Sequence, residues 1–162
     1  MPLTFEHIVR VNDLADPRLA PLSRNQLWQG LVRRAELPRY FMPWLENVEL
    51  TPQQDGSLAR ELDFGNFRVR DRVRFMEGES VSYEVEANAA VEHANVTMRI
   101  EEPAPGQLFV RFLYEIRSSQ YDGLGELEGF VKDAYRQADN ETVAGIRLLA
   151  ANHLLDERPS CH

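Results

Sequence analysis

Apolar and polar residues alternate with a period of two through the middle of the chain, a pattern typical of β-strands. Six such stretches cover residues 48–52, 58–64, 67–76, 80–89, 96–101 and 108–117. Short turn-forming segments such as QQDG, GN, EGE and EPAPG separate them. Because connections this short can join only antiparallel neighbours, the pattern predicts a six-stranded antiparallel meander.

One further strand and two short helical patterns precede this meander. Residues 4–12 alternate, with Phe5 and His7 on the same side, and predict the additional strand. Residues 24–36 repeat apolar residues at helical spacing after a candidate N-cap, Ser23, and predict a helix. The segment RYFMPWL that follows predicts a short second helix or a turn rich in aromatic residues.

The period becomes helical again over residues 125–155, which predicts one helix of about 25 to 30 residues. Its apolar stripe includes Phe130, Ala134 and Ile146. The apolar face of a seven-stranded sheet must be covered, and only this helix is long enough to cover it. The chain is therefore predicted to be an α+β protein. A curved antiparallel sheet wraps around the long C-terminal helix, with two short helices after the first strand.

Two opposite charges interrupt the inward face of the predicted sheet, in the segment RELDFGNFRVRDRVRF. The two-residue loop Gly65-Asn66 suits a tight hairpin, and its register places Arg60 opposite Asp71. Residues opposed in this way lie within reach of an ion pair. Two interpretations stay open: a buried pair that determines strand register, or a polar anchor in an otherwise apolar pocket. The outward arginines of the same strand are expected to form a solvated ladder of ion pairs.

The order of elements resembles the helix-grip fold of the START-like, pollen-allergen-like superfamily (SRPBCC) over nearly the whole chain. Within it, the segments GSLARELDFGNFRVRDRVRF, VSYEV, MRIEEPAPGQLFVRFLYEI and KDAYRQADNETVAGIRLL resemble the AtaL-like branch. The resemblance implies a cavity between sheet and helix that accepts a hydrophobic small molecule such as a lipid, a sterol, a polyketide or another aromatic compound. Some relatives in the superfamily are cyclases or condensing enzymes, whereas many only bind or carry a ligand.

The candidate ligand-binding residues lie on the inward faces of these elements, where apolar walls and a few polar groups converge. They are Arg60, Asp71, His7, Phe64, Val69, Val73, Tyr83, Met98, Phe112, Tyr114, Phe130 and Ala134. His7 is the candidate acid or base, because histidine titrates near neutral pH. Three functions remain open: ligand binding, a cyclase or dehydratase that uses His7 and the cavity tyrosines, and a structural module whose side chains fill the cavity.

Composition and charge exclude several other classes of function. The chain of 162 residues has 26 acidic and 18 basic residues, a net charge of −8, which argues against nucleic-acid binding. The single cysteine, Cys161, and the four histidines form no zinc pattern, and nucleotide and nucleophile motifs are absent, so no metal or cofactor is expected. No stretch is long and apolar enough for a membrane span and no signal peptide is visible, so a cytoplasmic location is expected.

The chain is expected to form one domain over residues 1–155, followed by a flexible tail at residues 156–162. On the outward face of the sheet, Ile8, Phe109 and Leu113 would lie together if the first and last strands are neighbours. They are either scattered surface residues or one exposed apolar patch through which two copies of the chain associate.

Overall fold

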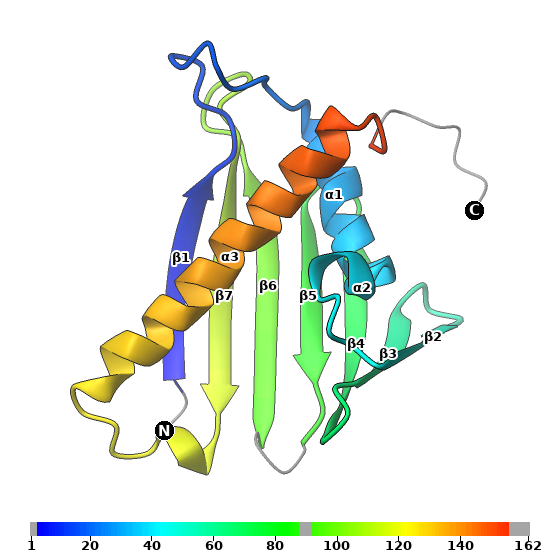
Figure 1. Cartoon of the computed structure of the whole chain (residues 1–162), viewed down its shortest axis with the longest axis vertical. Helices are drawn as coiled ribbons and strands as arrows, with labels where there is room; N and C mark the ends of the chain where they lie inside the picture. The colour runs from blue at the N-terminus through cyan, green and yellow to red at the C-terminus, as the bar shows by residue number, and fades with distance from the viewer. Residues whose placement is uncertain (1–2, 88–91, 156–162) are drawn as a thin grey trace.

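The structure, a computed structural model, describes residues 3–87 and 92–155 (Figure 1). The predicted tail, residues 156–162, lies outside the described residues. The elements in chain order are β1 (Leu3–Arg10), α1 (Arg24–Glu36), α2 (Pro38–Phe41), β2 (Asn47–Pro52), β3 (Leu58–Asp63), β4 (Arg68–Met76), β5 (Ser80–Val85), β6 (His93–Glu101), β7 (Phe109–Arg117), the 3-10 turn η1 (Ser119–Tyr121) and α3 (Leu127–Ala151).

The seven strands form one antiparallel sheet in the order β1-β7-β6-β5-β4-β3-β2. The first strand pairs with the last, and the other strands follow the chain as a meander. The long helix α3 crosses one face of the sheet diagonally, from β1 to the N-terminal end of α1, and α1 and α2 cover the part of that face that α3 leaves (Figure 1). The predicted α+β helix-grip fold is confirmed. No described helix is both long and apolar enough to cross a membrane.

The hairpin of β3 and β4 has the register that its two-residue loop predicts. Gly65 has a φ of 94°, a conformation that favours glycine, and Arg60 lies opposite Asp71. On the outer face, Arg68 pairs with Asp63 at 3.8 Å. Arg70 and Arg74 also form ion pairs, at 3.6 and 3.4 Å, so three of the four outward arginines are paired as predicted, whereas Arg72 has no ion pair within residues 3–87 and 92–155. Such exposed pairs mainly favour this register over a shifted one.

Helix α1 begins and ends where its sequence pattern predicts. Ser23 caps it in a capping box with Gln26. Gly30 lies where α1 crosses α3, and a Cβ atom there would be 2.3 Å from Cγ2 of Ile146. Only glycine permits this close approach, which holds α1 against α3 beside the concave face of the sheet.

The predicted apolar stripe of α3 is correct in the C-terminal half of the helix and wrong in the N-terminal half. Ile146 is fully buried, but Phe130 is 73% exposed and Ala134 is also exposed. Because α3 runs obliquely, its first turns extend towards the outer edge of the sheet at β1 (Figure 1). The residues that face the sheet there come one position later in the sequence than predicted. They include Tyr135, which is half-buried, and Asp139, which is buried.

Charged side chains divide the three residues of the predicted outer patch. Ile8 is 45% exposed, whereas Phe109 and Leu113 are half-buried. Arg111 lies opposite Ile8 and forms ion pairs with two carboxylates, and the guanidinium carbon of Arg10 lies 5.7 Å from the ring centre of Phe109. Association of two copies through this face stays a prediction.

Candidate functional site

A cavity of about 370 Å³ lies between the concave face of the sheet, α1 and α3. This volume is within the range of about 300–1,000 Å³ that is usual for small-molecule sites. Apolar side chains form most of its wall, and charged and hydroxyl groups converge in one part of it. The lining residues are Arg34, Met42, Arg60, Leu62, Phe64, Phe67, Val69, Asp71, Tyr83, Val85, Ala94, Val96, Met98, Tyr114, Ile116, Tyr135, Ala138, Asp139 and Thr142.

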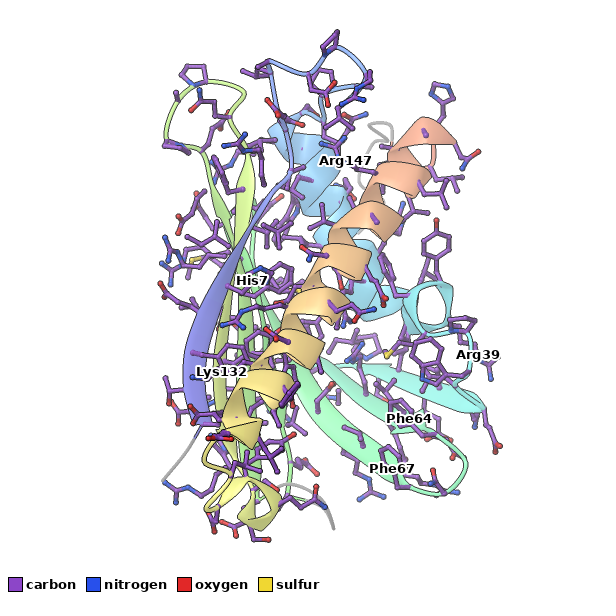
Figure 2. The ribbon with its side chains drawn as sticks, turned by 60° about the vertical axis from the view of Figure 1, so that its left-hand side comes forward. His7, Arg39, Phe64, Phe67, Lys132 and Arg147 are labelled. Carbon is purple, nitrogen blue, oxygen red and sulfur yellow. The ribbon has the colours of Figure 1, made fainter. Side chains whose placement is uncertain are left out.

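The structure brings seven of the twelve candidate residues to this wall. They are Arg60, Asp71, Phe64, Val69, Tyr83, Met98 and Tyr114. Figure 2 shows Phe64 at the tip of the β3–β4 hairpin beside Phe67, and the two rings stack with their centres 4.7 Å apart. Their position at the hairpin tip suits them to form one rim of the cavity.

The other five candidates lie elsewhere. Val73 and Phe112 face inward but are fully buried in the core, because strand alternation identifies the inward face without showing which part of it other residues cover. Phe130 and Ala134 on α3 are exposed and do not line the cavity. His7 lies between β1 and α3 and reaches the cavity only through a hydrogen bond to Asp139 (Figure 2).

The predicted pair Arg60–Asp71 is formed and buried. Nε and Nη2 of Arg60 donate to the two carboxylate oxygens of Asp71 at 2.8 and 2.6 Å, and the two side chains are 3% and 4% exposed. Nη1 of Arg60 donates to the carbonyl oxygen of Ala35 at 2.9 Å. Burial lowers the pKa of Arg60, but the hydrogen bonds and the charge of Asp71 outweigh it and raise the pKa. The pair therefore joins the hairpin to the last turn of α1.

A second guanidinium, that of Arg34 on α1, also lines the cavity. Its Nε donates to Oγ1 of Thr142 on α3 at 3.2 Å. Among residues 3–87 and 92–155, no carboxylate oxygen lies within 4.0 Å of it. Its guanidinium carbon lies 5.7 Å from the ring centre of Tyr83, which the guanidinium of Arg60 also contacts, at 5.0 Å.

Tyr83 is buried between these two cations. Its side chain is 5% exposed, and its hydroxyl has no hydrogen-bond partner in the described part of the chain. Burial raises the pKa of Tyr83, although the charges of Arg34 and Arg60 oppose this shift. The hydroxyl therefore stays protonated and can donate a hydrogen bond to a ligand.

Asp139 on α3 links the cavity to the surface. Its Oδ1 accepts a short hydrogen bond from the hydroxyl of Tyr114, and its Oδ2 accepts one from Nδ1 of His7 at 3.1 Å. Burial raises the pKa of Asp139, and the bonds from Tyr114 and His7 oppose this shift. Because the side chain of His7 is 19% exposed, the three residues form a hydrogen-bonded path from the cavity wall to solvent.

Three of these groups, Arg34, Tyr135 and Asp139, were not identified from the sequence. Arg34 and Asp139 were missed because charged residues on helices normally face solvent. One signal was available: counting back from Ile146 by four and then three residues gives Thr142 and Asp139, which continues the buried stripe through polar residues.

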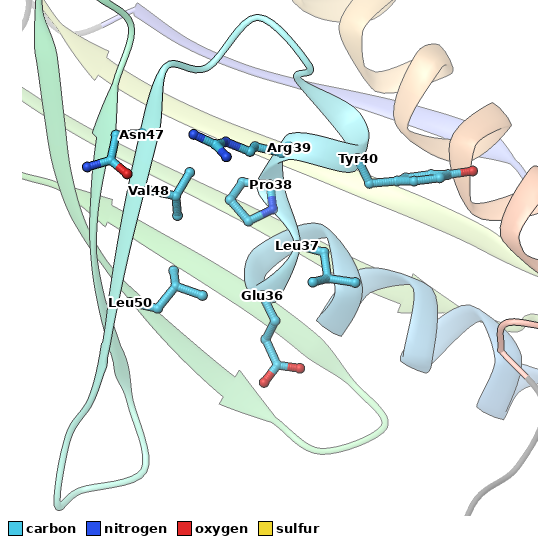
Figure 3. A pocket seen from close by; sticks show the side chains of 8 residues that line it. All are labelled: Glu36, Leu37, Pro38, Arg39, Tyr40, Asn47, Val48 and Leu50. Atoms are coloured by element: carbon cyan, nitrogen blue, oxygen red, sulfur yellow. The ribbon is translucent and has the colours of Figure 1, made fainter.

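A second hollow, of about 390 Å³, lies between the edge strand β2 and the segment that joins α1 to α2 (Figure 3). Its wall consists of Glu36, Leu37, Pro38, Arg39, Tyr40, Asn47, Val48 and Leu50. Leu37, Tyr40 and Leu50 are exposed there, so this is a surface groove with no buried polar group directed into it. In the described ranges, no three His, Cys, Asp or Glu side chains gather as metal ligands do.

Comparison with known proteins finds one matching family and several structures with the same fold. A sequence model of the family described as acetylaranotin biosynthesis cluster protein L, AtaL, matches residues 9–153. No curated protein sequence matches the chain.

Several solved structures share the fold at low sequence identity. The di-domain aromatase/cyclase StfQ from the steffimycin biosynthetic pathway has a TM-score of 0.68 and 7% identity over 94% of this chain. The match covers 52% of StfQ, so the chain spans about half of that protein. The ZhuI aromatase/cyclase from Streptomyces has a TM-score of 0.62 and 18% identity, over 95% of this chain and 96% of that one. Norcoclaurine synthase from Thalictrum flavum, in complex with dopamine and hydroxybenzaldehyde, has a TM-score of 0.62 and 12% identity over 94% and 88% of the two chains.

Proposed function

The chain belongs to the AtaL family, and from this membership and the geometry of its cavity we propose that it binds a hydrophobic or aromatic small molecule between the sheet and α3. The observation that carries the proposal is a cavity of about 370 Å³ with apolar walls and polar groups gathered in one part. This is the usual composition of a site that buries the body of a ligand and orients its polar end.

The polar part of the cavity limits which ligands fit. Arg60 and Asp71 satisfy each other's charge, so they add polarity to the wall without adding net charge. Tyr83 and Tyr114 present aromatic faces with a polar tip, which suits an amphipathic ring compound. Two of the structural relatives are named as aromatase/cyclases and a third was solved with two aromatic ligands, which supports an aromatic ligand here.

A matched pair of substitutions on α3 tests the proposal. Ala138 and Ala134 are both exposed residues of α3, but Ala138 lines the cavity, whereas Ala134, one turn earlier, does not. Ala138→Phe is expected to weaken binding of anthracene carboxamide, a neutral aromatic fluorophore, by on the order of tenfold. Ala134→Phe is expected to leave its affinity unchanged. Fluorescence titration measures both, and equal affinity for the two variants would contradict a ligand in this cavity.

Native mass spectrometry of the freshly purified protein gives an independent measurement. A reproducible extra mass that is lost on denaturation identifies a bound molecule and its chemical class. The Ala138→Phe variant is expected to carry less of it than the Ala134→Phe variant. An extra mass retained equally by both would place the molecule at another site.

A second candidate function is a cyclase-type enzyme, and the path Tyr114–Asp139–His7 favours it. As a carboxylate, Asp139 takes a proton from a carbon next to a ligand carbonyl, and the partly exposed imidazole of His7 allows exchange with water. Exchange of solvent deuterium into acetonaphthone, an aromatic ketone with such protons, measures this step. We expect Asp139→Asn to abolish the exchange, and an unchanged exchange rate would leave binding alone.

A further inference from the structure

We propose that Arg34 and the hydroxyl of Tyr83 bind an ionised oxygen of the ligand, so that the cavity takes an aromatic or aliphatic oxygen acid in preference to a neutral compound. The ionised oxygen belongs to a carboxylate or to a stable enolate. This inference rests on the proposed function and names its ligand class.

Of the two cations that contact Tyr83, one forms no ion pair with a carboxylate in the described part of the chain. Both guanidiniums contact its ring, with their central carbons 5.0 and 5.7 Å from the ring centre. Arg60 is neutralised by two hydrogen bonds to Asp71, but Arg34 has no carboxylate within 4.0 Å among the residues described. A charge on a cavity wall needs a partner or water, and an anionic ligand supplies the partner.

The hydrogen bond to Thr142 holds the guanidinium of Arg34 in place. Thr142 accepts a bond from Nε of Arg34 at 3.2 Å, and its own hydroxyl donates to the carbonyl oxygen of Ala138 at 3.1 Å. This contact uses the inner nitrogen and leaves the terminal nitrogens, Nη1 and Nη2, without an ion pair. A guanidinium fixed in this way presents a planar pair of donors, the arrangement that suits the two oxygens of a carboxylate.

The unpartnered hydroxyl of Tyr83 is a second, independent sign of a ligand. Nearly all buried hydroxyl groups in proteins have a hydrogen-bond partner. Tyr83 lines the cavity, is 5% exposed, and its hydroxyl has none in the described part of the chain. A ligand oxygen beside Arg34 would satisfy it. The wall that continues from this point through Val96, Met98 and Ile116 is apolar and suits the carbon skeleton.

Asp139 is a carboxylate on the same cavity wall, and its hydrogen bonds to Tyr114 and His7 explain why it does not exclude an acid. Its two oxygens already accept hydrogen bonds from Tyr114 and His7, and these bonds stabilise its negative charge. The charge of Arg34 also acts on Asp139 and lowers its pKa against the larger effect of burial. The ionised oxygen of the ligand therefore binds at Arg34 and Tyr83, away from the carboxylate oxygens of Asp139, which accept hydrogen bonds from Tyr114 and His7.

Matched acid and neutral probes test the inference. We expect the wild-type protein to bind anthracene carboxylate roughly tenfold more tightly than anthracene carboxamide. Arg34→Met should remove this preference, weakening the carboxylate by roughly tenfold or more and changing the carboxamide less than about threefold. Arg33→Met, on the same helix but outside the cavity wall, is the control and should change neither. Hydroxynaphthoquinone, an enolate at neutral pH, and its methyl ether form a second pair that tells an enolate site from a carboxylate site.

Tyr83→Phe provides a test that does not depend on the folding of the Arg34 variant. Removal of an unpartnered buried hydroxyl should leave the Tm of the free protein unchanged or higher. The same substitution should weaken anthracene carboxylate or the enolate several-fold and leave the neutral probes unchanged. A hydroxyl with only a structural role would give the opposite result, a lower Tm with unchanged affinity, and that would overturn the inference.

The remaining outcomes separate this inference from the proposed function. If carboxylate and carboxamide bind the wild-type protein equally, and the enolate and its ether also do, the oxygen-acid site is refuted while binding of aromatic molecules stands. The same holds if Arg34→Met weakens acid and neutral probes equally. If no probe binds the wild-type protein at all, the proposed function fails and this inference fails with it.

Discussion

Replacement of Asp71 by leucine should strongly destabilise the protein, because it leaves the guanidinium of Arg60 buried without its counter-charge. In the native structure the two side chains are 3% and 4% exposed and share two hydrogen bonds of 2.8 and 2.6 Å. Removing one partner of such a pair typically costs about 3–5 kcal/mol. This is a large part of the roughly 5–15 kcal/mol by which a domain is stable.

The double variant Arg60→Met/Asp71→Leu should be more stable than either single variant. Both charges are then replaced by apolar groups of similar volume, so no buried charge remains. The carbonyl oxygen of Ala35 still loses the bond from Nη1 of Arg60, which leaves an expected deficit of about 1–3 kcal/mol. The two substitutions should therefore be strongly non-additive, with a coupling energy of several kcal/mol.

Urea unfolding measures these free energies, with the fluorescence of the buried Trp28 as the signal. The control is the exposed pair of the same hairpin, in which Arg68 lies 3.8 Å from Asp63 and is 66% exposed. Arg68→Met should change the free energy of unfolding by less than about 1 kcal/mol. A loss for Asp71→Leu no larger than this control would refute the reasoning that burial makes the pair essential.

Gly30→Ala should lower the free energy of unfolding by about 1–3 kcal/mol, because the new Cβ atom would lie 2.3 Å from Ile146. Urea unfolding measures this loss, which should be much smaller when it is measured in an Ile146→Ala background. Ser23→Ala should cost about 1 kcal/mol by removing the cap of α1, measured in the same way, and a loss near zero would mean that the capping box is not formed in solution. The last comparison is between the single variant His7→Asn and the double variant His7→Asn/Asp139→Asn. The free energy of unfolding of the single variant should fall relative to that of the double variant as the pH rises from 3.8 through the raised pKa of Asp139. The reason is that the carboxyl group of Asp139 binds its proton more tightly in the folded than in the unfolded state. A single variant that gains stability relative to the double variant as the pH rises would show that the pKa is lowered instead.

The sheet could be predicted almost completely from the sequence, because strand pairing follows local rules. A two-residue loop at Gly65 leaves one register that keeps the apolar residues together, and this register places Arg60 opposite Asp71 across 11 residues of chain. The bounds of the strands differed by a few residues at most. Strand β5 was predicted to extend to residue 89 but ends at Val85, and of the predicted extension residues 88 and 89 lie outside the described residues.

The helical side of the site could not be predicted in the same way. The bonds from Arg34 to Thr142 and from His7 to Asp139 join positions 108 and 132 residues apart, and no local rule relates such positions. The choice of Phe130 as the inward residue followed hydrophobicity, which is a good guide where a helix covers a packed core. It failed in the half of α3 that contains Phe130, where Val131 packs against the core and the inward residues that follow, Tyr135 and Asp139, carry polar groups.

The two cavity arginines differ in how much of their bonding capacity the protein itself satisfies, and this difference separates structure from function. Arg60 has its charge and three of its donors satisfied by Asp71 and Ala35, so its loss should appear in the free energy of unfolding. Arg34 has one donor satisfied and no carboxylate within 4.0 Å in the part of the chain that the structure describes, and the hydroxyl of Tyr83 beside it has no hydrogen-bond partner there. Such groups reduce the stability of the free protein and become favourable only when a ligand meets them. An AtaL-family protein that retains them at its cavity is therefore expected to be less stable free than bound, and its acid-binding residues are those whose substitution changes affinity more than folding.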